Sequence, residues 1–229
     1  MISNYGGFVR ELLAAGFSQF GGSRDSVATL FRYGWNNQPE DSPVEWHCSD
    51  PDRDPWQWRQ RVLERGDIAY SKVFFRKHGF ITREWYPYFL AVRRRGRDFG
   101  DAYADGLHSR AALRVYECLQ QNGALPVHEI KPLAEFRRDE KAAFERALVE
   151  LEMGLHITVC GHAQKISRAG ESYGWASDVY CLTEEFFPEE VFSAASLLNP
   201  KAAADKIEGQ VYRLNPEAEP KRVRKFIFG

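Results

Sequence analysis

Apolar residues recur with a helical spacing in several stretches of the chain. In residues 3–15, Phe8 and Leu12 fall on one face. In residues 111–123 a stripe from Ala112 to Leu119 follows the i, i+3, i+4, i+7 pattern. This spacing predicts amphipathic helices that bury one side. By the same pattern, with proline, glycine and capping residues at the ends, helices are predicted over 26–33, 55–64, 82–92, 126–131, 137–152, 188–198 and 200–212.

Strand patterns are fewer. Apolar and polar residues alternate over 155–159, and residues 175–182 form a second β-rich run after a polar, glycine-containing loop at 161–174. Alternation with period two is typical of a half-buried strand. Residues 68–75 favour a strand but leave a helix possible, and residues 36–54 predict a loop because Pro, Asp and Asn are frequent there.

The order helix, short helix, helix, strand, loop, strand over 106–190 predicts a winged helix-turn-helix module. Three short helices would bury their apolar stripes against one another, and the hairpin would close the open side. The expected fold class is therefore mainly α with a minor α+β part. Residues 1–105 form the expected N-terminal helical region, and residues 191–229 the C-terminal helices and a basic tail.

Charge is distributed unevenly along the 229 residues, although the formal net charge is only -1. Residues 1–52 carry -4, residues 53–97 carry +8, and residues 98–229 carry -5. The basic segment is also rich in aromatic side chains. Near-neutrality alone argues against a nucleic-acid binder, but a basic segment inside a neutral chain restores that possibility.

Several classes of protein are not expected from this sequence. No apolar run approaches the roughly 20 residues that span a bilayer, and the start lacks the pattern of a signal peptide. We therefore expect a cytoplasmic protein without membrane contact. The four cysteines lie far apart and no CxxC occurs, so no metal site is expected. Since no phosphate-binding glycine motif is present, no cofactor is expected either.

Two sets of residues carry a family resemblance. Residues 147–154 and 179–188 resemble a winged-helix module of the AlkZ/YcaQ DNA glycosylases, over about residues 107–190. The phrases DPWxWR at 54–59, AYxK at 69–72 and REWYPYF at 83–89 make the whole chain similar to the shorter AlkZ-related group. The resemblance implies tandem winged helices, DNA binding and a possible role in DNA repair.

The resemblance also implies where catalysis would occur. Those glycosylases use a Gln-x-Asp or Gln-x-Gln motif that holds a water for attack on the sugar of a damaged nucleotide. Neither motif occurs in this sequence, and the nearest match is Gln19-Phe20-Gly21. Gln19 is thus the motif-derived catalytic candidate, and Gly21 cannot orient a water. DNA glycosylase activity is left open. The alternatives are a transcriptional regulator and a non-catalytic winged-helix interaction module.

Cationic side chains are the candidates for contact with double-stranded DNA, either intact or damaged. Arginine suits phosphate because its guanidinium donates two parallel hydrogen bonds. An oligomer is also possible, and a two-fold dimer that presents both 137–152 helices about one DNA turn apart would favour the transcriptional regulator. The candidates are Arg76, Lys77, Arg83, Arg93, Arg94, Arg95 and Arg97 from the basic segment, Arg137, Arg138, Lys141 and Arg146 from the predicted recognition helix, and Lys165 and Arg168 from the hairpin.

Overall fold

One antiparallel sheet runs through the molecule. The computed structural model describes residues 2–22, 26–166 and 170–229, and within them the sheet has the strand order β1-β3-β2-β5-β6-β4. Neighbouring strands pair antiparallel throughout. The strands are β1 (Phe17–Gln19), β2 (Ile68–Phe74), β3 (Lys77–Thr82), β4 (Leu125–Pro126), β5 (Ile157–Ile166) and β6 (Ser172–Leu182).

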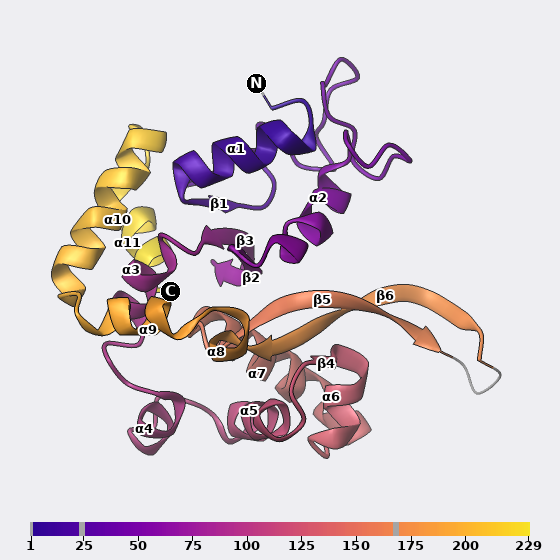
Figure 1. Ribbon diagram of the computed structural model, residues 1–229, viewed down its shortest axis with the longest axis vertical. Coiled ribbons are helices and arrows are strands. Elements are labelled where there is room, and N and C mark those ends of the chain that lie inside the picture. The colour runs from indigo at the N-terminus through magenta and orange to yellow at the C-terminus, as the bar shows by residue number, and fades with distance from the viewer. Residues whose placement is uncertain (1, 23–25, 167–169) are drawn as a thin grey trace.

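Helices cover the sheet from several sides (Figure 1). The helices α1 and α2 lie on one side of the β5–β6 hairpin, and α5, α6 and α7 lie on the other. The C-terminal helices α10 and α11 lie beside α3. The helices are α1 (Tyr5–Ala15), α2 (Pro55–Arg61), α3 (Tyr86–Arg93), α4 (Phe99–Ala104), α5 (Arg110–Asn122), α6 (Val127–Leu133), α7 (Lys141–Met153), α8 (Thr183–Phe186), α9 (Glu189–Ser196), α10 (Pro200–Leu214) and α11 (Pro220–Phe228), with 3-10 turns η1 (Leu63–Arg65) and η2 (Arg138–Glu140).

Side-chain caps define where several helices begin. The Asn4 side chain accepts a hydrogen bond from the Gly7 amide at the start of α1. Asp54 does the same for Trp56 in α2, directly before Pro55. Ser109 caps α5 in the same way. A short polar side chain at this position satisfies an amide that has no partner within the helix, and proline fits the first helical turn.

Two hydrophobic clusters form the core. One joins Phe8, Trp58 and Tyr70 of the N-terminal part with Val115 and Leu148 of the helices on the other side of the hairpin. The other cluster packs α3, α9, α10 and α11 around strands β1 and β2. Because each cluster contains residues that are distant in sequence, the packing of every layer depends on the others.

The expectation of a mainly α protein built on a winged helix-turn-helix is wrong. The predicted helices near 111–123, 126–131 and 137–152 and the two following strands are present. However, β5 also pairs with β2 through Tyr70 and Val159. The hairpin is therefore part of a longer antiparallel sheet, and the fold is α/β. The N-terminal part likewise contributes three of the strands, instead of helices alone.

Two further local expectations are also wrong. Residues 26–33 are irregular instead of helical, because Gln19 of β1 binds the backbone amides of Val27 and Ala28. The predicted polar loop at 161–174 is largely strand, since β5 continues to Ile166 and β6 begins at Ser172. Polar residues can form strands where neither face of a hairpin is fully buried.

Candidate nucleic-acid interface

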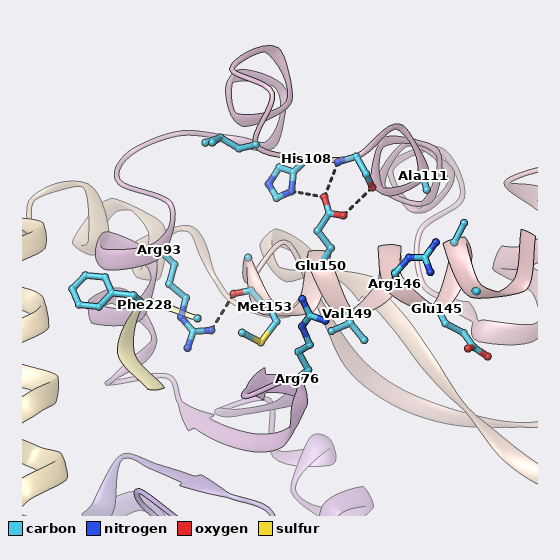
Figure 2. Close-up of a pocket in the computed structure, with 16 residues that line it drawn as sticks. Arg76, Arg93, His108, Ala111, Glu145, Arg146, Val149, Glu150, Met153 and Phe228 are labelled. Carbon is cyan, nitrogen blue, oxygen red and sulfur yellow. Dashed lines mark hydrogen bonds and ion pairs between the residues drawn. The ribbon is translucent and has the colours of Figure 1, made fainter. Parts of the chain in front are cut away.

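A cavity of about 950 Å³ lies beside α7. The start of α5, the turn between β2 and β3, and the last residues of the chain form its other walls. Arg76, Arg93 and Arg146, which are far apart in sequence, all line it. Figure 2 shows Arg76 extending from the β2–β3 turn toward α7, while Arg146 extends from α7. The fold therefore brings arginines from the basic segment and from α7 to one place.

Arg93 is held by the protein itself. Its guanidinium donates four hydrogen bonds of 2.8–3.0 Å to the backbone carbonyl oxygens of Val73, Met153, Phe226 and Ile227. Burial lowers its pKa to about 10, so the group stays charged at neutral pH. Four of its five N–H donors are used in this way. Arg93 thus joins α3, β2, α7 and α11, and its guanidinium has a structural role.

Arg94, directly after the end of α3, has a similar role. It donates to the side chains of Thr183 and Glu184 and to the carbonyl oxygen of Leu155, and its side chain is only 9% exposed. Arg95 and Arg97 are exposed, and Arg97 forms an ion pair of 2.9 Å with Asp105. The run of arginines at 93–97 therefore divides into two half-buried connectors, Arg93 and Arg94, and two surface cations.

Most of the other predicted cations are exposed. Arg76, Lys77 and Arg83 are exposed. Arg137, Arg138 and Lys141 at the start of α7 are exposed too, and so is Arg146 in the middle of that helix. Acidic neighbours neutralise part of this charge, because Arg137 lies 3.6 Å from Glu140 and Lys141 lies 3.7 Å from Glu145.

The hairpin carries the remaining predicted cations. Lys165 is half-buried and pairs across the strands with Tyr173. The neighbouring Ile166 and the ring of Tyr173 are exposed. Arg168 lies outside the described residues. The described end of the hairpin thus presents one cation beside two apolar side chains.

Gln19, the catalytic candidate, has a structural role in this fold. Its Oε1 accepts hydrogen bonds from the amides of Val27 (2.7 Å) and Ala28 (3.2 Å). Its backbone pairs with Gly79 of β3. These bonds hold the irregular segment after β1 against the sheet. The carbonyl oxygen that would orient a water is therefore already occupied by backbone donors.

A histidine network supports the wall of the cavity. His108 Nδ1 lies 3.0 Å from Glu150 Oε1, and its Nε2 lies 3.0 Å from Nε2 of His156. Glu150 also accepts hydrogen bonds from the amide and hydroxyl of Ser109 (Figure 2). Burial, with smaller effects from Arg94 and His108, lowers the pKa of His156 to about 2, so that ring is neutral. This network fixes the start of α5 to α7.

Sequence reasoning missed a second polar cluster, between α2 and the hairpin. Arg59, buried on α2, lies with its Nη1 2.7 Å from His162 Nε2 and 3.5 Å from Asp178 Oδ1. His162 and Asp178 are direct partners across β5 and β6. A possible signal was that Arg59 ends the phrase DPWxWR, but its partners follow more than a hundred residues later. Only the fold brings them together.

The described residues show no other obvious chemical centre. None of their histidine, cysteine, aspartate and glutamate side chains form a group that could hold a metal ion. Among the helices described, none is long and apolar enough to cross a membrane.

Fold and site together define an α/β protein with an antiparallel sheet and an arginine-lined cavity beside a surface helix. Over residues 2–228 the chain matches the model of the AlkZ-related family, and it therefore belongs to that family. This makes it a DNA glycosylase-like relative. No curated protein and no solved structure shows a significant match to the chain.

Proposed function

We propose that this protein binds double-stranded DNA through the face that surrounds the α7 cavity. The observation that carries the proposal is that Arg76 and Arg146 are both exposed and line the same cavity. One guanidinium group can donate two parallel hydrogen bonds to the oxygens of one phosphate. Two such groups from separate elements can therefore contact neighbouring phosphates. Family membership supports DNA as the polyanion.

The hairpin supplies a second contact in this proposal. A two-stranded ribbon is narrow enough to enter a DNA groove. Lys165 can approach the backbone there, and the exposed Ile166 and Tyr173 offer apolar contact. Phosphate contacts set position and affinity without reading sequence. We therefore propose binding as the function, and assign no base excision to Gln19, because its side chain holds backbone amides.

The test is a titration of binding to a labelled duplex of about two helical turns, followed by fluorescence anisotropy at several salt concentrations. We expect affinity to fall as salt rises. Arg76→Ala and Arg146→Ala should each weaken binding and reduce the slope of log K against log salt by about 0.9, the value for one lost phosphate contact.

A matched control is Arg10→Ala, which removes an exposed arginine from α1 and from a different part of the surface. It should leave the slope unchanged. Absence of salt-dependent binding by the wild-type protein at low salt would refute the proposal, as would an equal loss in the control variant. A parallel duplex with an abasic site determines whether damaged DNA is preferred.

A further inference from the structure

In the outer half of the β5–β6 hairpin, the two described strands pair with each other and with no other described strand. Within the described strands, β5 meets β2 at Tyr70 and Val159, and β6 meets β4 through Val179 and Tyr180. Beyond this base the two strands pair with each other as far as Ile166 and Ser172. Figure 1 shows the hairpin extending away from the helices. Contacts by side chains near its base must therefore set its direction.

Arg59 makes such a contact from the α2 side. Its Nη1 lies 2.7 Å from His162 Nε2 and 3.5 Å from Asp178 Oδ1, and His162 Nε2 lies 3.0 Å from the same carboxylate oxygen. Burial alone would raise the pKa of Asp178, but the contact with the His162 ring and the charge of Arg59 outweigh it and lower that pKa. The carboxylate is therefore ionised, and Arg59 meets both strands of the hairpin at one level.

The position of Arg59 is itself fixed. Its guanidinium stacks on the ring of Trp56, 4.0 Å from the ring centre, and its side chain is only 8% exposed. The helix that carries both residues is capped by Asp54, which also accepts a hydrogen bond from the amide of His47. A buried planar group held in this way transmits the orientation of α2 to its partners.

The opposite side of the hairpin is held at the same level. His128 of α6 lies with its Nδ1 3.0 Å from the hydroxyl of Ser177, the residue next to Asp178. Side chains of α2 and α6 thus hold the two strands from opposite sides, and we call these contacts of Arg59 and His128 the grip on the hairpin. Residues closer to the hairpin tip, including Lys165 and Tyr173, extend beyond this grip.

We propose that Arg59 is a positioning residue for nucleic-acid contact, which holds the hairpin in its binding direction through His162 and Asp178 without touching the nucleic acid. This inference rests on the proposed DNA binding. A hairpin ordered in advance loses less conformational freedom when it binds, so part of the cost of association is removed. Loosening the grip should therefore weaken binding although no residue that contacts DNA has changed.

The experiment compares Arg59→Met, which keeps an unbranched apolar stem but removes the guanidinium, with Asp178→Asn, which keeps the shape and removes the charge. For each we measure duplex affinity by anisotropy, amide hydrogen exchange in the hairpin, and the melting temperature. We expect faster exchange at residues 163–166 and 172–176 and roughly fivefold weaker binding. Because both changes release the same grip, the double variant should bind about as well as either single variant.

The matched control is Arg61→Met, on the same helix. Arg61 packs on the ring of Tyr5 and bonds the carbonyl of Pro51, away from the hairpin. It should change neither hairpin exchange nor affinity. Should Arg59→Met fail to fold, Asp178→Asn alone decides the question.

The outcomes separate this inference from the proposed function. Wild-type protein that does not bind duplex refutes the function, and the inference with it. Wild-type binding that Arg59→Met and Asp178→Asn leave unchanged, despite faster hairpin exchange, refutes the inference alone. The inference is also refuted if the losses of binding free energy in the two single variants add up in the double variant. Arg59 and Asp178 would then act separately.

Discussion

At the scale of single residues, burial decides what a charged group does. Glu152 lies on the inner side of α7 and is fully buried. One of its oxygens accepts the amide hydrogen of Lys72 at 3.0 Å. Burial raises its pKa to about 7, even though Lys72 acts in the opposite direction. A buried carboxyl group is costly when ionised, so Glu152 links the stability of the fold to pH.

In Glu152→Gln, the free energy of unfolding should change less with pH than in the wild type. In the unfolded chain the carboxyl ionises near 4.5, and in the folded protein near 7. As pH rises between these values only the unfolded state loses the proton, so the free energy of unfolding falls, by about 3 kcal/mol at most. Urea unfolding at pH 5 and pH 8 measures the change, and the variant should lose less stability than the wild type.

Two buried histidines change the stability with pH in the opposite direction to Glu152. The pH dependence of the wild type alone therefore cannot isolate the effect of Glu152, and the Glu152→Gln variant is needed. Burial lowers the pKa of His78 to about 4 and that of His156 to about 2. Both rings are neutral in the folded protein and become protonated on unfolding below about 6.5, so stability falls toward acid pH. Glu145→Gln, on the exposed side of α7, is the control. An identical pH difference in Glu152→Gln and wild type would contradict the assignment.

At the scale of elements, the junction between α1 and β1 depends on one glycine. Gly16 ends α1 with φ 86°, and a Cβ there would lie 2.2 Å from Cδ1 of Trp85. Its carbonyl accepts the amide of Thr82, which joins the junction to β3. Both the backbone conformation and the close approach of the ring require a residue without a side chain.

Gly16→Ala should therefore destabilise the protein more than an alanine at another glycine of positive φ. Gly66, with φ 69°, has no atom within 4 Å of an added Cβ, so Gly66→Ala should cost only about 1–2 kcal/mol for the backbone conformation. Gly16→Ala adds the displacement of Trp85, and we expect a total of at least about 3 kcal/mol. Urea unfolding compares the two, and equal losses would contradict the role of Trp85.

The helices and strands differ in how well the sequence predicted them. The stripes of α5 and α7 were recognised because a helix is stabilised by contacts within a few residues. The strands β1 and β3 were missed, because Phe17–Gln19 is short and Lys77–Thr82 begins with polar residues. Their pairing joins Phe17 to Ile81, more than sixty positions along the chain. Strand formation depends on such partners more than on local preference.

At the scale of the whole molecule, the sheet makes residues 106–190 dependent on the rest. The β5 strand pairs with β2, and Leu148 and Val159 share a hydrophobic cluster with Trp58 and Tyr70. A fragment of residues 106–190 would expose its side of this cluster and the edge of β5 around Val159. We expect it to be largely unfolded or aggregated.

Circular dichroism and proton NMR of the purified fragment, with the full chain as control, test this expectation. The full chain should give dispersed amide signals and a single thermal transition. A fragment with dispersed signals and a cooperative transition of its own would contradict the expectation. It would show instead that residues 106–190 fold independently, as the sequence alone predicts.

The candidate interface was predicted only in part, and the reason lies at the same scale. Arg76 and Arg146 were named from sequence as cations, but nothing local indicates that they line one cavity. Arg93 and Arg94 belong to the most basic run of the chain, yet their guanidinium groups bind carbonyl oxygens and side chains of distant elements. Local charge predicts a cation, whereas packing decides whether it faces solvent.

The sequence by itself therefore determined the features that depend on near neighbours: most of the amphipathic helices, the Asp54 cap of α2, the position of the basic segment and the resemblance to the AlkZ-related family. Only the tertiary structure decided the sheet that joins β2 to β5, the division of arginines between connectors and surface, and the grip of Arg59 on the hairpin. Each of these depends on contacts between residues far apart in the chain, and such contacts form only when the whole core closes.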